Sequence, residues 1–156
     1  MTLQAWHGAH RWEGPPVVRP QGSRNVEHGP GIYLATGYDS ATKYARGGGT
    51  MMLVALEPGL RWLEQSTLPL ADAVAAARAI CGPVIGARIG ADLARNAERM
   101  KARLGGAVIM AAVFVNLAVN EGAASGARGV KLAAYLAHHG IGASLVHQSN
   151  EGACLL

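Results

Sequence analysis

The sequence predicts an α+β fold in a single domain, with short strands near both ends and a helical block between them. Residues 3–64 and 141–156 hold short apolar runs separated by glycine and proline, which is typical of strands joined by turns. Residues 68–139 are instead rich in alanine, and their apolar residues recur every three or four positions, as in amphipathic helices. We therefore expect the strands that follow the helices to return to the first sheet.

Composition excludes several classes of protein. A chain of 156 residues can bury a core without disulfides or metal ions, and an apolar fraction of 50% argues against intrinsic disorder. Cys81 and Cys154 lie far apart without a CxxC pair, and the six histidines do not join them at metal-ligand spacing, so we expect neither a disulfide framework nor a metal site. The net charge of +4 suits phosphate-bearing ligands or nucleic acid, although many other domains are equally basic.

No segment is expected to enter or cross a membrane. Met1 to His7 lacks the basic segment and apolar core of a secretory signal. The most apolar run, Ala107 to Val119, is shorter than the roughly 20 residues of a membrane-spanning helix and contains Asn116. We expect this run to be a buried helix and the protein to be cytoplasmic.

The first two strands are expected on either side of a long loop. Leu3 to His7 is a candidate strand that ends at Gly8, and residues 10–29 form a loop with three prolines and three glycines. Gly29-Pro30-Gly31 allows a tight turn before a short strand, Ile32 to Leu34, which carries Tyr33.

A short helix follows the second strand. Asp39 or Ser40 is the expected N-cap, and the helix runs to about Ala45. Tyr44 shares a face of this helix with two alanines, which leave room beside its ring. Taken alone, Tyr33 and Tyr44 are most simply interpreted as core aromatics.

Apolar patterning predicts the remaining elements. Met51 to Leu56 is apolar throughout and is expected to be a fully buried strand, and Leu60 to Glu64 is expected to be an edge strand. Helices are expected at residues 71–80, 85–104, 107–120 and 130–138, with a flexible connection at 122–129; the third is apolar nearly all round and therefore central. Two short strands, residues 143–147 and 153–156, enclose Glu151.

Sequence motifs leave few candidates for chemistry. The nucleophile-elbow, Walker, HExxH and Rossmann patterns are absent, as is a close pair of carboxylates. What remains is His7-Gly8 at the end of the first strand, Tyr33 in the second, Tyr44 in the helix after it, and Glu151 between the last two strands.

These residues resemble the nicotinamide-binding core of ADP-ribosyltransferases of the diphtheria-toxin and poly(ADP-ribose) polymerase branch, which carries a His-Tyr-Glu triad on three strands. Trp6-His7-Gly8 resembles the first motif of that branch, and Asn150-Glu151 resembles the pair that opens its third. The second motif is matched by Gly31-Ile32-Tyr33-Leu34-Ala35, then Ser40-Ala41-Thr42-Lys43-Tyr44-Ala45, a glycine turn and the run from Met51 to Leu56. The resemblance covers residues 5–56 and 141–156, and the order of elements is similar to that of small phage-encoded ADP-ribosyltransferases.

The resemblance implies a split-sheet ADP-ribosyltransferase fold with a helical insertion at about residues 68–139. It implies an enzyme that cleaves the nicotinamide–ribose bond of NAD and transfers ADP-ribose to a macromolecular acceptor, either a protein or a nucleic acid. The helical block is outside the resemblance, so we expect it to hold target specificity or a contact between copies of the chain.

The resemblance also assigns roles. The Gly8 backbone would bind the nicotinamide carboxamide with help from Ser40, and Tyr33 and Tyr44 would hold the ring between them. His7 would bind the adenosine-ribose hydroxyl.

Glu151 would hydrogen-bond the nicotinamide-ribose hydroxyl, stabilise the oxocarbenium-like transition state and orient or deprotonate the acceptor. An arginine of the long loop would meet the diphosphate, and Arg11, Arg19 and Arg24 remain equal candidates.

Some positions depart from the pattern of the family. Ser40 lies four residues before Tyr44, where the polymerases have three, and Gly152 follows Glu151 where a bulky strand residue is usual. Glu121 is an alternative acid, although it lies in the helical block.

Two other functions remain open. One is RNA 2′-phosphotransfer, a related activity of the same fold. The other is a catalytically inactive binding module or inhibitor that acts through the helical block, and it requires the apolar helix at Ala107 to Val119 to be partly exposed.

Overall fold

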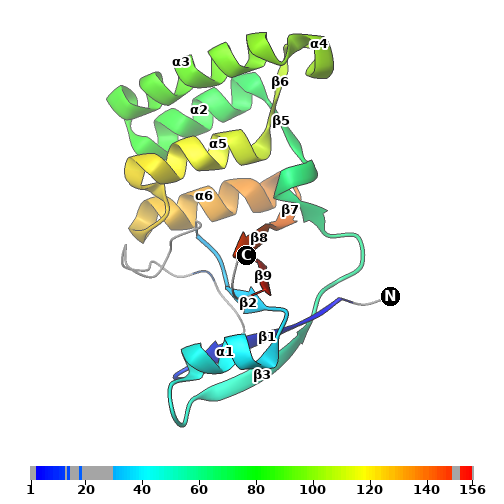
Figure 1. Cartoon of the computed structure of the whole chain (residues 1–156). Helices are drawn as coiled ribbons and strands as arrows, with labels where there is room; N and C mark the ends of the chain where they lie inside the picture. The colour runs from blue at the N-terminus through cyan, green and yellow to red at the C-terminus, as the bar shows by residue number, and fades with distance from the viewer. Residues whose placement is uncertain (1–2, 13, 15–17, 19–29, 149–151, 156) are drawn as a thin grey trace.

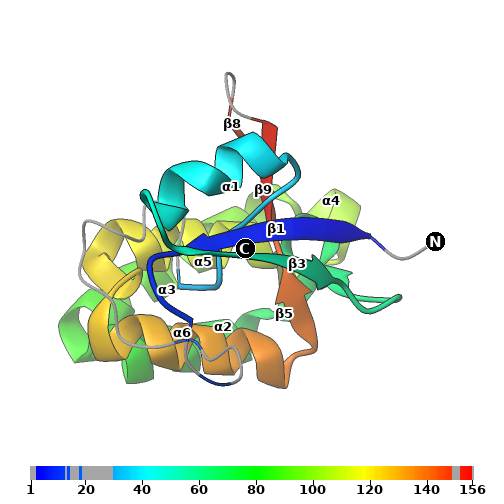
Figure 2. The same cartoon turned by 90° about the horizontal axis from the view of Figure 1, so that it is seen from below.

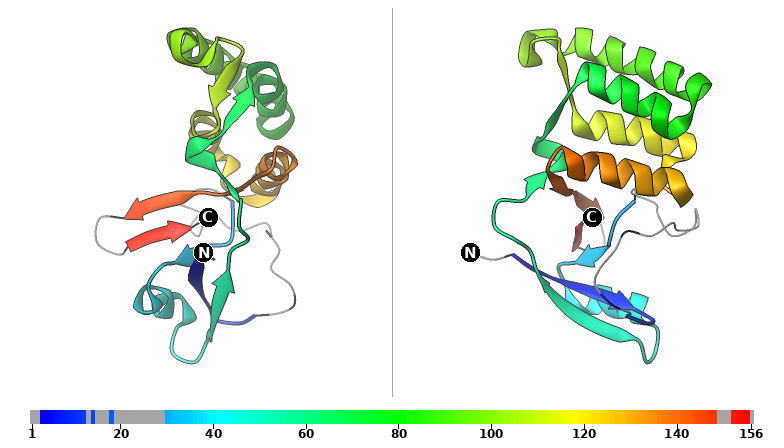
Figure 3. Two further views of the ribbon diagram at one scale, coloured as in Figure 1. Left: turned by 90° about the vertical axis from the view of Figure 1, so that its right-hand side faces the viewer. Right: turned by 180° about the vertical axis from the view of Figure 1, so that it is seen from behind.

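The structure of the protein, a computed structural model, describes residues 3–12, 14, 18, 30–148 and 152–155. It confirms an α+β arrangement, in which a sheet lies on one side of the molecule and a stack of helices on the other (Figures 1 and 3). Within the described part of the chain, no helix is both long enough and apolar enough to cross a membrane.

Five antiparallel strands form the main sheet, in the order β3-β1-β2-β9-β8. The strands are β1 (Gln4–Ala9), β2 (Leu34–Ala35), β3 (Thr50–Ala55), β8 (Leu145–Gln148) and β9 (Gly152–Leu155). Ala35 of β2 lies opposite Cys154 of β9, although the whole helical block separates them in sequence. The prediction that the late strands return to the first sheet is therefore confirmed.

Two strand boundaries differ from the sequence prediction. The strand β1 continues through Gly8 to Ala9, because glycine here serves packing rather than a turn: a Cβ on Gly8 would lie 1.9 Å from the carbonyl oxygen of Ala41. Tyr33 precedes β2 rather than lying inside a strand.

The prediction that β3 is fully buried is wrong. β3 is an edge strand, and each of its residues is exposed or half-buried, with Leu53 50% exposed. An unbroken apolar run resembles a central strand, but burial also depends on how many strands flank it. Here only β1 does so among the described residues.

Helix α1 (Tyr38–Ala45) lies directly on β1 (Figure 2). Its N-cap is Gly37, not Asp39 or Ser40, and the predicted end at Ala45 is confirmed. Two alanines, Ala41 and Ala45, are buried against the strand, whereas Tyr44 is 55% exposed. Tyr44 is thus not a core aromatic.

The helical block comprises α2 (Leu70–Cys81), α3 (Pro83–Arg99), α4 (Lys101–Leu104), α5 (Ala111–Ala118) and α6 (Gly126–His138). The predicted 85–104 helix is interrupted at Met100, and the predicted 107–120 helix begins late because Val108–Met110 forms β6, paired with β5 (Thr67–Pro69). The connection expected at 122–129 is present but shorter: the chain kinks at Glu121 and Gly122, whose backbone angles are not helical, and α6 already begins at Gly126.

The main core lies inside the helical block. The largest fully buried side chains are Phe114, Leu68, Ile89, Leu93, Ile109 and Leu132. Phe114 lies on α5, which confirms that this helix is central. The sheet contributes a much smaller buried cluster around Ala5 and Leu34, so most of the hydrophobic stabilisation resides in the helices.

A short connection joins sheet and helices. β4 (Arg61–Trp62) pairs in parallel with β7 (Ile141–Ala143), and a 3₁₀ turn, Leu63–Gln65, follows β4. Arg61 Nη1 donates a hydrogen bond to the carbonyl oxygen of His139 at 2.8 Å. The edge strand predicted at Leu60 to Glu64 is therefore present, but only two residues long.

Candidate functional site

His7 and Tyr33 lie together at the junction of β1 and β2. The Nδ1 atom of His7 is 2.9 Å from the carbonyl oxygen of Tyr33. Because a carbonyl oxygen only accepts hydrogen bonds, Nδ1 is the donor in this contact, and Nε2 is the ring nitrogen left for another partner. The ring also contacts Trp12 edge to face, at a centroid distance of 5.2 Å.

The side chains of β1 alternate between two faces. Trp6 and Gly8 face α1, since the Trp6 ring contacts Tyr38 at 4.9 Å and Gly8 abuts the α1 backbone. Ala5 and His7 therefore point to the opposite face, toward the helical block, where Ala5 is buried. His7 and the α1 residues thus approach the sheet from opposite faces.

The pairing of β1 with β2 is short. Among the described residues, β1 pairs with β2 only through Trp6 and Ala35. Gly8 remains paired with Met51 of β3, on the other side of β1. The candidate residues therefore lie on both faces of the sheet, beside the place where the pairing of β1 with β2 ends.

Tyr33, Ser40 and Tyr44 are placed near the end of this pairing by β2 and α1. Tyr33 directly precedes β2, and Ser40 is half-buried in the first turn of α1. Among the residues that the structure describes, no aromatic ring contacts the ring of Tyr44.

Asn150 and Glu151 lie outside the described residues, as do Arg19 and Arg24; Arg11 is described and exposed. Gly152, the residue after Glu151, opens β9 and pairs with Gln148. The residue after Glu151 therefore begins β9, and β9 pairs with β2, the strand that begins directly after Tyr33.

Glu121, the alternative acid, belongs to a different part of the molecule. It lies at the kink between α5 and α6 and forms an ion pair with Arg88 of α3. Its carboxylate is engaged within the helical block and is not on an element of the sheet. The structure therefore does not bring Glu121 to the His7–Tyr33 junction.

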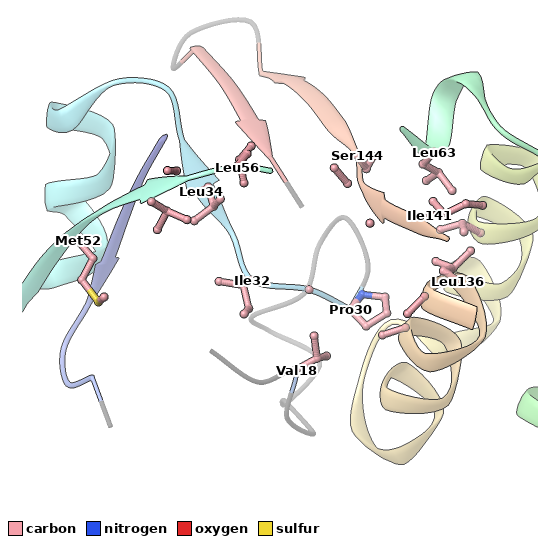
Figure 4. A pocket seen from close by; sticks show the side chains of 18 of the residues that line it. Val18, Pro30, Ile32, Leu34, Met52, Leu56, Leu63, Leu136, Ile141 and Ser144 are labelled. Carbon is pink, nitrogen blue, oxygen red and sulfur yellow. The ribbon is translucent and has the colours of Figure 1, made fainter. Parts of the chain in front are cut away.

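An apolar cavity of about 590 Å³ lies on the His7 face of the sheet. Figure 4 shows Ile32 and Leu34 on one side of it and Leu136 and Ile141 on the other. Trp12, which contacts His7, also lines it.

The sequence interpretation missed this cavity because it depends on how far α6 stands from the sheet. Its walls are almost entirely apolar, which does not suit a diphosphate. The polar exception is Ser144, whose hydroxyl donates a hydrogen bond to the carboxylate of Glu64.

The two side chains whose pKa values are shifted by burial, Tyr135 and Cys81, lie in the helical block. Burial raises the pKa of Tyr135 to about 12, and the carboxylate of Asp72 adds to the rise. Burial also raises the pKa of the Cys81 thiol, an effect that Arg128 opposes and Glu121 reinforces. Among the described residues, no three His, Cys, Asp or Glu side chains converge as a metal site.

No protein family model, curated protein sequence or solved structure matches the chain. A function therefore has to be argued from the residues and the geometry above. The geometry that bears most on it is the sheet order, which makes β1, β2 and β9 neighbours.

Proposed function

We propose that the protein is an NAD-dependent mono-ADP-ribosyltransferase with an ADP-ribosyltransferase-like sheet. One observation supports this most: the segments that carry or border the three motifs, at His7, Tyr33 and Glu151, lead into adjacent strands β1, β2 and β9. The helical block that separates the second motif from the third in sequence does not separate them in the sheet. Such convergence is what a three-strand catalytic site requires.

In this proposal the nicotinamide ring binds where the pairing of β1 with β2 ends. Tyr33 and Tyr44 flank the ring, and the exposure of Tyr44 is in accord with a wall that is completed only when the ring is bound. The Gly8 backbone binds the carboxamide, with Ser40 assisting. His7, held by its bond to the Tyr33 carbonyl, offers Nε2 to the adenosine-ribose hydroxyl.

Glu151 carries the chemistry in this proposal. The bond between the nicotinamide nitrogen and ribose C1′ breaks, and its electron pair leaves with nicotinamide. Positive charge then develops on the ribose, and a carboxylate close to it lowers the barrier. An acceptor oxygen or nitrogen forms the new bond to C1′, and Glu151 takes its proton.

The binding-module alternative requires the apolar helix near Ala107 to Val119 to be partly exposed. Phe114 and Val115 of α5 are buried, whereas Val113, Leu117 and Val119 are half-buried, so this alternative stays open. RNA 2′-phosphotransfer stays a second candidate of the same fold. A cytoplasmic location and a protein or nucleic-acid acceptor remain parts of the main proposal.

The test is incubation of the full chain with NAD and lysate, measuring released nicotinamide and labelled acceptors. We expect transfer by the wild type and a loss of about a thousandfold in Glu151→Gln, which retains shape but not charge. Glu121→Gln is the matched control and should retain activity. No release of nicotinamide by the wild type, or full activity in Glu151→Gln, would refute the proposal. NAD-dependent transfer of the phosphate from a 2′-phosphorylated RNA to ADP-ribose would instead favour the second candidate.

A further inference from the structure

No described strand pairs with the outer edge of β3. Among the described residues, β3 pairs only with β1, through six residues from Thr50 to Ala55 in continuous register. The strand contains no charged residue and no proline. Monomeric proteins usually protect such an edge with lysine, proline or a bulge, because its free N–H and C=O groups pair readily with another chain.

An apolar side chain marks the middle of this edge. Leu53 is 50% exposed and is one of few large apolar side chains in the described chain with such exposure. Figure 1 shows β3 at the end of the sheet farthest from the helical block. Leu53 also lines the apolar cavity described above.

Opposite charges flank the strand. Arg46 precedes β3 and Glu57 follows it, and both are exposed. Neither forms an ion pair with another described residue. A strand with a positive group before it and a negative group after it is complementary to an antiparallel copy of itself.

We propose that a second copy of this chain pairs with β3 edge to edge, in an antiparallel two-fold dimer. Residues opposite each other in an antiparallel pair point to the same face, and side chains alternate with period two. One residue of β3 must therefore lie opposite the same residue of the second copy, and the two-fold axis passes between them. We place the axis at Leu53, because its side chain is apolar and exposed. Leu53 then packs against Leu53 of the second copy.

This register sets unlike charges near each other at each end of the strand pair. With the axis at Leu53, Glu57 of one copy lies opposite Gly49 of the other, three residues along the chain from Arg46. The two-fold symmetry repeats this attraction at the other end of the pair. The two five-stranded sheets join into one, and no free β3 edge remains.

The test is sedimentation equilibrium of the full chain, with circular dichroism to verify folding. We expect the wild type to dimerise and Leu53→Lys, which sets two like charges opposite each other, to raise the dissociation constant at least about tenfold. Val84→Lys is the control, because Val84 is 83% exposed but lies on α3. It should leave the dissociation constant unchanged.

Charge exchange tests the register without disturbing the strand. Arg46→Glu and Glu57→Arg should each weaken the dimer, and the double variant should restore the dissociation constant to within about threefold of wild type. A monomeric wild type, a dimer indifferent to Leu53→Lys, or a double variant weaker than both singles would each overturn the proposal. A monomer that binds an extended peptide at β3 would assign the edge to another partner and overturn it too.

Discussion

The Nδ1 atom of His7 and the carbonyl oxygen of Tyr33, 2.9 Å apart, join the end of β1 to the chain that enters β2. This contact orients the imidazole, because it makes Nδ1 the hydrogen-bond donor and leaves Nε2 for another partner. It also holds the two strands at the place where their pairing ends. The proposed chemistry depends on both effects.

Replacing His7 by alanine should therefore affect both stability and activity. We expect the free energy of unfolding to fall by about 1 kcal/mol, since one hydrogen bond is lost, and NAD cleavage to fall by about a hundredfold. Thermal denaturation and nicotinamide release measure the two effects. His10→Ala is the control, because His10 is exposed, and it should change neither. Wild-type NAD cleavage by His7→Ala would remove His7 from the site.

Replacing Gly8 by alanine should displace α1. A Cβ at Gly8 would lie 1.9 Å from the Ala41 carbonyl oxygen, and a backbone atom cannot move aside as a flexible side chain does. We expect a loss of about 3 kcal/mol in urea denaturation. At Gly37 the nearest atom to a Cβ is 3.9 Å away and φ is −107°, so Gly37→Ala should stay within about 1 kcal/mol of wild type. Equal effects at the two positions would contradict the described packing of α1.

The contact between α2 and α3 offers a matched pair of glycines. A Cβ at Gly86 would meet the Arg78 backbone at 2.4 Å, whereas one at Gly90 would meet only the side chain of Val74, at 3.1 Å. In a helix, alanine is more stabilising than glycine by up to about 1 kcal/mol. We expect Gly86→Ala to destabilise by about 2 kcal/mol and Gly90→Ala to be close to neutral in urea denaturation. The reverse order would show that α3 packs on α2 differently.

Tyr135 should make stability fall at alkaline pH. Its pKa is about 12 in the folded protein against an ordinary value of 10.0, so between these values the unfolded chain binds fewer protons than the folded one. Its contribution is complete below pH 10 and is lost as the pH rises toward 12. The difference in urea midpoint between wild type and Tyr135→Phe should therefore change across this window. A constant difference would show that Tyr135 is not shielded from water.

Tyr135→Phe should also leave the fold intact at neutral pH. The Tyr135 hydroxyl is buried without a hydrogen-bond partner in the structure. Removing an unsatisfied group avoids its desolvation, so we expect equal stability or a gain of about 1 kcal/mol at pH 7. A clear loss would indicate a partner for the hydroxyl, such as a bound water.

Glu64 should hold the start of β8 in place. Its Oε1 atom accepts hydrogen bonds from the Ser144 hydroxyl and from the Leu145 amide, the latter at 3.3 Å. Glu64→Ala leaves the buried Ser144 hydroxyl unpaired, so we expect a loss of about 2 kcal/mol and faster hydrogen exchange at the Leu145 amide. Glu64→Gln keeps an acceptor oxygen and should lose less than half as much. Equal losses would mean that charge, not the acceptor, matters.

Strong periodicity made the helical block predictable. The apolar stripe of α3 and the nearly all-apolar α5 specify helices whatever their neighbours. Three-residue strands such as β5 and β6 carry too short a pattern, and their pairing depends on where the helices place them. Gly8 was interpreted as a strand end because sequence cannot distinguish a glycine that turns the chain from one that admits a neighbouring backbone.

The candidate site was predictable in part. The sequence located His7 and Tyr33, and the structure brings them together. It did not indicate that His7 and Tyr44 lie on opposite faces of the sheet. That depends on which side chains of β1 point to each face and on which face α1 packs against. The cavity depends on the spacing of sheet and α6, which no local pattern encodes.

The sheet order has a consequence for how the chain folds. The core of the helical block draws on residues from Leu63 to Ile141, a continuous stretch with mostly local contacts, so it can form early and quickly. The main sheet needs β9 beside β2, a pairing that must close a loop containing the entire block. Because β8 and β9 follow the helical block in sequence, the sheet that carries His7 and Tyr33 can close only after the whole block has been synthesised.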